Sequence, residues 1–263
     1  MILWLASYPK SGNTYVRSLL SAYLFSQDGD FNFGLLKNFI QFPNKVVFEK
    51  LGIDTTNTNE LLKNYINSQK YINELEEKNS IKFVKTHSAC ASKNNYKFTD
   101  LSNSLGVIYI VRDPRNVVTS FSHHFQKSKK EATNDLISNF ILSPNSPRHV
   151  FTFLGSWNFH YNSWKKFKDH HKYLLVKYED LVENPKENLL QMLKFISKVG
   201  NIKIDIDKNK ISKILETTNF KKLQDLEKKN GFKESKINKN TGEKINFFNL
   251  GKDNNWKNLL DKE

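Results

Sequence analysis

Apolar and polar residues follow one another along the chain in a pattern that predicts strands alternating with helices. Continuous apolar or alternating runs predict four strands, at 2–6, 81–86, 106–111 and 172–178. Apolar residues at helical spacing predict helices over the opening segment up to residue 25 and at 59–79, 116–125, 156–167, 185–196 and 207–217. Such alternation is typical of an α/β fold with a central, largely parallel sheet flanked by helices.

The segments between these elements are less regular. We expect residues 28–50 to form a loop-rich segment whose phenylalanines pack on the core or, alternatively, wall a ligand pocket. Residues 127–150 predict a polar loop, and residues 228–246 are a tail rich in lysine and asparagine. No internal repeat or linker is evident, so we expect a single domain over residues 1–263.

The first 25 residues have the strand–loop–helix order of an anion-binding site. A polar loop at 7–14 carries Lys10 and Gly12 between the first predicted strand and its helix. Backbone N–H groups in the first turn of a helix have no partner within it, and the helix dipole is positive there. Because Lys10 precedes the glycine, the loop differs from the common NTPase pattern G-x-x-x-x-G-K-[ST] and predicts a different class of enzyme.

Each of the four predicted strands ends in polar residues or is directly followed by them. They are Lys10-Ser11, Lys85-Thr86-His87, Arg112 and Tyr178-Glu179-Asp180. Parallel sheets bind ligands at the carboxyl ends of their strands, so these residues predict one site along that edge. We expect Glu179 and Asp180 to be structural residues and not an acid–base pair.

Two candidate phosphate anchors and one candidate base stand out in this set. The first anchor is the loop with Lys10, and the second is Arg112 with Ser120, which lies on the same face of the following helix. Two separate anchors suit a nucleoside with phosphates at both ends better than a linear triphosphate. His87 is a candidate general base, since its ordinary pKa is close to neutrality. No acidic or His/Cys cluster has metal-ligand spacing, so we expect no metal.

Composition changes the picture in two respects. The net charge is +14, yet only four of the 41 basic residues are arginines and the lysines are scattered, which argues against a nucleic-acid partner. Cys90 is the single cysteine, so internal disulfides are excluded and a reducing compartment is favoured. Without a membrane-length apolar run or a basic leader, the sequence leads us to expect a cytoplasmic protein with no membrane partner.

Several motifs of this chain resemble those of the cytosolic-type sulfotransferases that use 3′-phosphoadenosine 5′-phosphosulfate (PAPS). SYPKSGNTY at 7–15 resembles the family's 5′-phosphosulfate loop, KTH at 85–87 its catalytic segment, and VRDPRNVVTS at 111–120 its 3′-phosphate motif. Further matches in the family order are Gly155-Ser156-Trp157 with His160 and Trp164, Tyr178-Glu179-Asp180-Leu181 with Asn184-Pro185, and Thr218-Asn219-Phe220. The resemblance covers nearly the whole chain and implies a P-loop-like three-layer fold.

The resemblance implies in-line transfer of the sulfuryl group from PAPS to a hydroxyl or amine of a small-molecule or glycan-like acceptor, without a metal. His87 is then the general base, Lys10 stabilises the charge that builds on the leaving oxygen, and Lys85 assists at the sulfonate. The residues implied to bind PAPS are Lys10, Ser11, Gly12, Asn13 and Thr14 at the 5′-phosphate, Arg112 and Ser120 at the 3′-phosphate, Tyr15, Tyr178, Thr218 and Phe220 at the adenine, and Gly251 in the C-terminal motif.

The chain departs from the family pattern in four places. Tyr15 stands where tryptophan is usual, and Ser88-Ala89 replaces Leu-Pro after the histidine. Asn249-Leu250 replaces the Arg-Lys pair of the F-x-R-K-G motif. We expect this replacement to weaken the binding of PAPS by roughly one to three decades unless Lys244 or Lys252 takes the place of the lost pair. The K-T-V-E dimer signature has no counterpart, which leaves the oligomeric state open.

Two alternatives to a sulfotransferase stay open at this point. One is a P-loop-like nucleotide kinase, against which the order of lysine and glycine in the loop speaks. The other is a protein that binds nucleotide or nucleic acid without turnover. Lys10, Lys85 and His87 favour catalysis, while Asn249-Leu250 keeps the second alternative open. The neighbouring His123 and His124 are rival candidates for the base.

Overall fold

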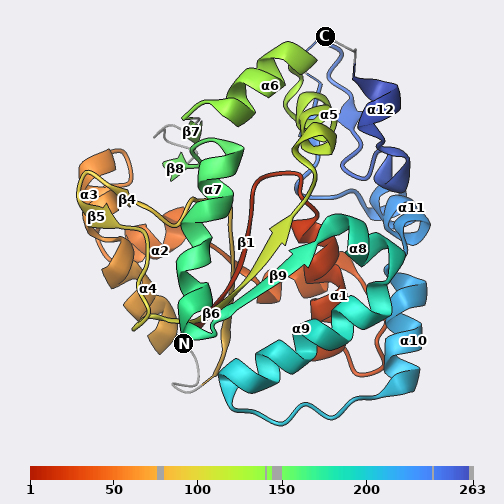
Figure 1. Ribbon diagram of the computed structural model, residues 1–263, viewed down its shortest axis with the longest axis horizontal. Coiled ribbons are helices and arrows are strands. Elements are labelled where there is room, and N and C mark those ends of the chain that lie inside the picture. Colours follow the sequence, from red (N-terminus) through yellow and green to blue (C-terminus); the bar gives the residue numbers. More distant parts are fainter. Residues whose placement is uncertain (76–79, 140, 144–149, 239, 261–263) are drawn as a thin grey trace.

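A parallel sheet forms the centre of the molecule. The computed structural model describes the chain except residues 76–79, 140, 144–149, 239 and 261–263. Among the residues described, the central sheet has five strands in the order β2-β3-β1-β6-β9 (Figure 1). Their bounds are β1 Ile2–Ser7, β2 Ile40–Gln41, β3 Lys82–Thr86, β6 Ser104–Val111 and β9 Tyr173–Lys177. All pairings are parallel, so the carboxyl ends share one edge. The four predicted strands are confirmed, while β2 is too short to show periodicity in the sequence.

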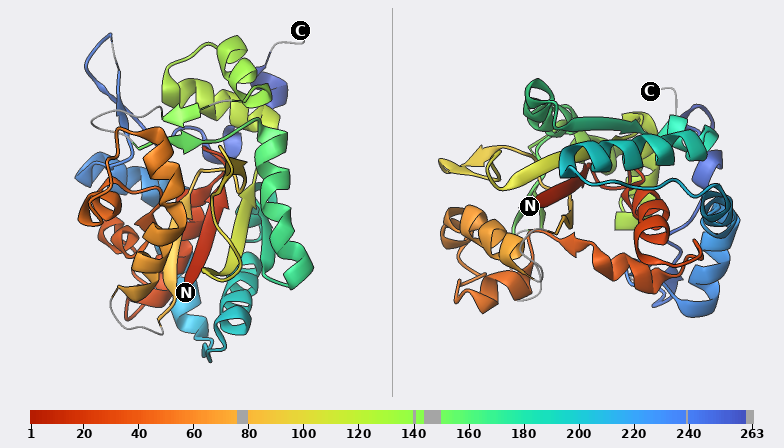
Figure 2. Two further views of the ribbon diagram at one scale, coloured as in Figure 1. Left: turned by 90° about the vertical axis from the view of Figure 1, so that its left-hand side faces the viewer. Right: turned by 90° about the horizontal axis from the view of Figure 1, so that it is seen from below.

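The strand β1 is buried on both faces, which explains its continuous apolar sequence. Leu3 and Leu5 pack into one core cluster, whereas Ile2, Trp4 and Ala6 pack into the other. Successive side chains of a strand point to opposite faces, so a strand with a core on each side has no polar face. Figure 2 shows the strands at the centre of the molecule with helices on both sides.

Helices cover the two faces of the sheet and its carboxyl edge. The face of Leu3 and Leu5 packs against α1 Asn13–Phe25, α9 Pro185–Gly200, α10 Lys208–Thr217 and α11 Phe220–Asn230. The opposite face packs against α2 Lys45–Lys50, α3 Thr58–Lys63, α4 Tyr65–Glu74 and the 3-10 helix η2 Trp164–His170. Beyond the carboxyl edge lie α5 Pro114–Phe125, α6 Lys129–Ile137 and α12 Trp256–Leu259 (Figure 1).

Short elements complete the described part of the chain. These are α7 Trp157–Ser163, α8 Tyr178–Glu183, η1 Phe33–Asn38 and η3 Gly251–Asp253, with the hairpins β4 Ser92–Lys93 and β5 Tyr96–Lys97, β7 Ile141–Ser143 and β8 Thr152–Phe153, and β10 Lys236–Ile237 and β11 Lys244–Ile245. Within the described residues, no helix is long and apolar enough to span a membrane.

Three sequence predictions of secondary structure were wrong in part. The helix expected at 59–79 is two helices that meet at Asn64, and residues 76–79 lie outside the described part. The polar loop expected at 127–150 contains α6, because Ser128 and Glu131 form a capping box and Ala132 and Leu136 are buried; residues 140 and 144–149 are not described. The helix expected at 156–167 continues as the 3-10 helix η2.

Two segments expected to be irregular carry defined structure. The tail at 228–246 begins inside α11 and continues as the β10–β11 hairpin. The segment 28–50 contains η1, β2 and α2. Its phenylalanines at 31, 39, 42 and 48 are buried in the two core clusters, which favours the packing interpretation over a pocket wall.

Candidate active site

A cavity of about 1160 Å³ opens at the carboxyl ends of the central strands. Most residues singled out from the sequence line it: Lys10, Gly12, Asn13, Thr14, Tyr15, Lys85, His87, Arg112, Ser120, Tyr178, Phe220 and Gly251. Ser11 and Thr218 do not line this cavity. The tertiary structure therefore brings residues from six separate stretches of sequence to one place.

The loop between β1 and α1 approaches the cavity through an unusual backbone. Lys10 has φ 66° and Gly12 has φ 100°. A Cβ on Gly12 would lie 2.4 Å from the Tyr178 ring, so glycine is required both by its conformation and by this contact. Asn13 braces the loop by donating from Nδ2 to the Leu5 carbonyl at 3.1 Å and to Ser7 Oγ at 3.2 Å.

The start of α1 has hydrogen-bond donors that could bind an anion. Gly12 is its N-cap, and no side chain caps the helix there. Ser11 is 1% exposed, and its Oγ has no hydrogen-bond partner among the described residues. A buried hydroxyl without a partner is costly, and an anion at this helix end would satisfy it.

Lys10 lies in a crowded cationic environment. Its Nζ is 3.6 Å from the centroid of the Phe247 ring. Burial, together with the nearby charges of Arg112 and Lys85, lowers the pKa of Lys10 to about 7. An anion that enters beside Lys10 would favour its charged form.

Lys85 is paired with a residue that the sequence did not reveal. Its Nζ lies 3.2 Å from Oε1 of Glu234, and burial with the charge of Arg17 lowers the pKa of Lys85 to about 8. Arg17 Nη2 donates to the same Glu234 oxygen at 2.7 Å and to Thr14 Oγ1 at 3.0 Å. The only sequence signal for Arg17 is its place one turn after Asn13 on the opening helix, and Glu234 had none.

The backbone carbonyl of Ser7, at the end of β1, holds His87 in one tautomer. Its Nδ1 lies 2.9 Å from the Ser7 carbonyl oxygen, which can only accept, so Nδ1 carries the proton and Nε2 has a free lone pair. Burial and the charge of Lys85 lower the pKa of His87 to about 3. His160 donates from Nε2 to the His87 carbonyl at 3.1 Å, which supports the same segment. His87 is therefore neutral and able to accept a proton.

Arg112 forms the core of the second candidate anchor. It is 6% exposed, lies 4.2 Å from the centroid of the Tyr178 ring, and donates from Nη1 to the Lys10 carbonyl at 3.3 Å. Its Nε has no hydrogen-bond partner among the described residues. Asp113 pairs with Arg115 and caps α5, which leaves the Arg112 guanidinium directed to other partners.

The residues next to these anchors are structural, as the sequence led us to expect. Glu179 accepts a hydrogen bond from the Asp113 backbone N–H at 3.0 Å, and Asp180 lies 3.9 Å from Lys177. Both carboxylates stand in the first turn of α8. They link or support the strand ends and are not paired with each other.

Aromatic residues surround the remaining part of the cavity. Tyr15, Tyr178 and Phe220 line it, and burial raises the pKa of Tyr15 to about 12. Gly251 has φ 58°, and a Cβ there would lie 2.8 Å from the Phe220 ring. Thr218 is different: it is completely buried and its Oγ1 donates to the Ile214 carbonyl at 2.7 Å. The structure thus gives Thr218 a partner in the preceding helix, α10.

The two rival histidines also reach the cavity. His123 Nε2 lies 3.3 Å from the Asn246 carbonyl oxygen, and His124 packs edge-on against the Phe247 ring. Burial, with the charge of Lys10, lowers the pKa of His124 to about 3. Neither directly follows a strand of the central sheet, as His87 does. Within the described residues, no group of three or more His, Cys, Asp and Glu side chains has metal-binding geometry.

Comparison with known proteins identifies related chains and folds. The family model described as "Sulfotransferase domain" matches residues 2–263. Sulfotransferase 1A1 of Canis lupus familiaris is 26% identical over 223 residues, and sulfotransferase 1B1 of the same species is 27% identical over 230 residues. Each match covers 84% of this chain and 65% of the relative, so the chain spans about two thirds of the length of these relatives.

Two solved structures share the fold. Mouse sulfotransferase SULT7A1, complexed with PAP, matches with a TM-score of 0.59 at 16% identity over 99% of this chain and 79% of that one. Retinol dehydratase, in complex with androsterone and the inactive cofactor PAP, matches with a TM-score of 0.61 at 18% identity over 99% and 76%. The expected three-layer α/β fold is thereby confirmed.

Proposed function

The chain belongs to the sulfotransferase domain family, and from that premise we propose that it transfers a sulfuryl group from PAPS to a hydroxyl or amine of a small-molecule acceptor. PAPS, when bound, supplies the sulfuryl group and a bisphosphate leaving group. The relatives are matched over only part of their length, so the activity is our proposal for this chain.

One observation carries this proposal: each candidate phosphate anchor contains a buried donor that lacks a partner. Ser11 Oγ belongs to the loop anchor and Arg112 Nε to the second anchor, and neither has a hydrogen-bond partner among the described residues. Leaving a buried donor unsatisfied costs about 1–3 kcal/mol. Arg112 lines the cavity, and Ser11 lies between the cavity-lining residues Lys10 and Gly12. A nucleotide with phosphates at its 5′ and 3′ ends would bring an anion next to both anchors, which supports the donor that the sequence motifs imply.

The residues between the anchors suit proton transfer and charge stabilisation. His87 offers a neutral Nε2, with its tautomer held by the Ser7 carbonyl, and would take the proton of the acceptor. Lys10 and Lys85 line the same cavity and would stabilise negative charge as it develops during in-line transfer. Anionic charge beside Lys85 would raise the low pKa of His87, because the charge of Lys85 contributes to lowering it.

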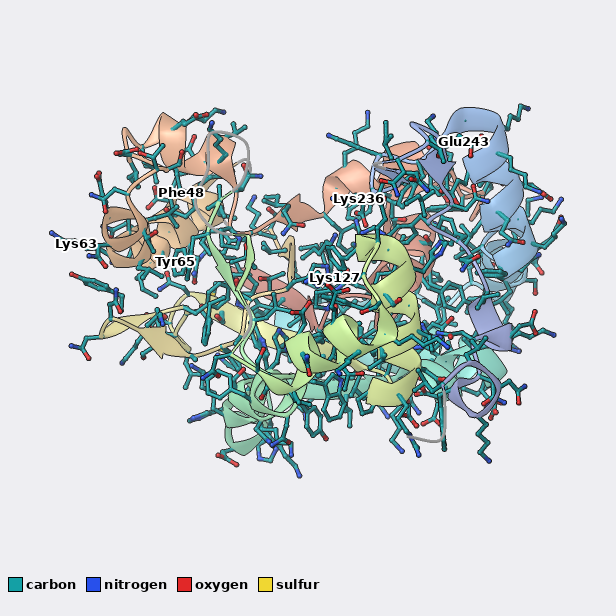
Figure 3. All side chains as sticks on the ribbon, turned by 90° about the horizontal axis from the view of Figure 1, so that it is seen from above. Phe48, Lys63, Tyr65, Lys127, Lys236 and Glu243 are labelled. Atoms are coloured by element: carbon teal, nitrogen blue, oxygen red, sulfur yellow. The ribbon has the colours of Figure 1, made fainter. Side chains whose placement is uncertain are left out.

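Donor binding is tested first by calorimetry in buffer without metal. We expect the wild-type protein to bind adenosine 3′,5′-bisphosphate, and ATP with Mg²⁺ to bind much more weakly. Lys10→Met should weaken binding of the bisphosphate, whereas Lys63→Met, on the exposed surface (Figure 3), should leave it unchanged. A preference for ATP with Mg²⁺ would favour the kinase alternative and overturn the proposal. With the bisphosphate bound as expected, transfer from sulfur-labelled PAPS to a panel of phenols, alcohols and amines identifies the acceptor class.

A further inference from the structure

Glu234 places a carboxylate among the cations of the loop anchor. Its Oε1 lies 2.7 Å from Arg17 Nη2 and 3.2 Å from Lys85 Nζ, and its Oε2 accepts from Thr14 Oγ1 at 3.3 Å. Arg17 is 4% exposed and Lys85 is 8% exposed. Burial alone would raise the pKa of Glu234, but Lys85 and Arg17 outweigh it and hold that pKa well below its usual range. The carboxylate is therefore charged.

The segment that carries Glu234 is anchored on both sides of it. Phe232 packs against Phe33 at 4.6 Å and against Phe247 at 4.9 Å between ring centroids. Glu227 on α11 accepts hydrogen bonds from Ser235 Oγ at 2.5 Å and from the Phe247 backbone N–H at 2.7 Å. These contacts do not involve the cations, so packing brings the carboxylate to this position from a part of the chain more than 140 residues away from Lys85.

Glu234 supplies the negative charge that a bound anion would otherwise supply to Arg17 and Lys85. Two buried cations without a counter-charge would be strongly destabilising, and the carboxylate neutralises them in the free protein. Thr14 and Lys85 are also groups expected to meet the 5′ end of PAPS. A phosphosulfate cannot use those groups while a carboxylate holds them, because the two anions would repel each other at contact distance.

We propose that Glu234 is an internal anion that competes with the 5′ end of the donor nucleotide, so that it sets donor affinity and leaves Thr14 and Lys85 when the donor binds. This inference rests on the proposed function. It makes Glu234 a determinant of donor affinity, supplied by the segment that leads into the β10–β11 hairpin. Lys236 and Glu243, both labelled in Figure 3, mark that hairpin.

The test compares Glu234→Gln with Glu243→Gln, which removes the same charge from an exposed position on the hairpin that follows Glu234. Glutamine keeps the shape and an acceptor oxygen of Glu234 and removes only its charge. Calorimetry with adenosine 3′,5′-bisphosphate should give at least tenfold tighter binding for Glu234→Gln and no change for Glu243→Gln. With adenosine 3′-monophosphate, which lacks the competing 5′-phosphate, both variants should match the wild type.

A measurement that needs no nucleotide guards against misfolding of the variant. Without its counter-charge, Glu234→Gln should melt at a lower temperature than the wild type, and inorganic sulfate should raise its melting temperature more than that of the wild type. Glu234→Asp keeps the charge but shortens the reach by one methylene, so its affinity for the bisphosphate should lie between those of the wild type and Glu234→Gln.

The outcomes separate this inference from the function on which it rests. If the wild type binds the bisphosphate and Glu234→Gln binds it equally or more weakly, Glu234 is a positioning partner of the cations and the inference is wrong. If only Glu234→Gln binds measurably, competition by the carboxylate is supported. Failure of all variants to bind, with normal melting curves, overturns the proposed function itself and the inference with it.

Discussion

Replacing Arg112 with alanine should weaken binding only of nucleotides that carry a 3′-phosphate. Arg112 is 6% exposed, its guanidinium lies 4.2 Å from the centroid of the Tyr178 ring, and its Nε has no partner among the described residues. Burial lowers the pKa of Arg112 from its ordinary value, which means that the free protein holds this charge at a cost. A phosphate that reaches it would form charge-assisted hydrogen bonds.

The size of the effect follows from these contacts. A hydrogen bond to a charged group contributes about 1.5–3 kcal/mol, and two such bonds would contribute about twice that. Removal of the guanidinium also relieves the cost of burying an unpaired charge, so we expect a net loss equivalent to one bond. At about 1.4 kcal/mol for each tenfold, the affinity for adenosine 3′,5′-bisphosphate should fall about 10- to 150-fold.

The assay is calorimetry with two ligands and one matched control. Adenosine 5′-monophosphate lacks the 3′-phosphate, so its affinity should change little in Arg112→Ala. Arg115→Ala removes a guanidinium three residues away that pairs with Asp113 and does not line the cavity, and it should leave both affinities unchanged. Equal losses for the two ligands in Arg112→Ala would refute the reasoning, since the role of Arg112 would then not depend on the 3′-phosphate.

Three further predictions concern the base, the loop lysine and the adenine end. His87→Ala should reduce transfer by about 10²- to 10⁴-fold and leave the bisphosphate affinity within threefold of the wild type, as measured by single-turnover kinetics and calorimetry. Turnover that survives in this variant would shift the base role to His123 or His124. Burial lowers the pKa of Lys10 to about 7, so an anion bound beside it should take up a proton, and affinity should fall as the pH rises from 7 to 9. Calorimetry in buffers of different ionisation enthalpy measures this uptake, and Lys10→Arg should flatten the profile; an affinity independent of pH in the wild type would contradict the lowered pKa. Thr218→Val should lower the free energy of unfolding, measured in urea, by about 0.5–1.5 kcal/mol and leave the dissociation constant of the bisphosphate unchanged. The reason is that the Thr218 hydroxyl donates its hydrogen bond to the Ile214 carbonyl of α10. Phe220→Ala should weaken nucleotide binding about tenfold, because stacking on the adenine is lost. If calorimetry shows a larger loss of nucleotide affinity in Thr218→Val than in Phe220→Ala, Thr218 contacts the adenine after all.

Local physical chemistry explains which parts of the fold the sequence predicts well. A strand buried on both faces must be apolar throughout, and β1 and β6 show this directly. The loop at 7–14 requires a glycine at φ 100° and precedes an uncapped helix, so adjacent residues explain both its conformation and the prediction that it binds an anion. The prediction was poorer for β2, which has only two residues, and for α6. The sequence of α6 is mostly polar, and only its capping box and two buried residues, Ala132 and Leu136, indicate a helix.

The sequence by itself thus determined four strands of the central sheet, the loop at 7–14 that leads into α1, and the placement of Lys85, His87 and Arg112 at strand ends, because each depends on contacts within a few positions of the chain. Only the tertiary structure decided which partners these side chains meet. The pairing of Lys85 with Glu234 joins residues 149 positions apart, and no local pattern specifies it. The burial of Thr218 likewise depends on how α10 and α11 pack, because a polar residue is exposed or enclosed according to what lies across from it.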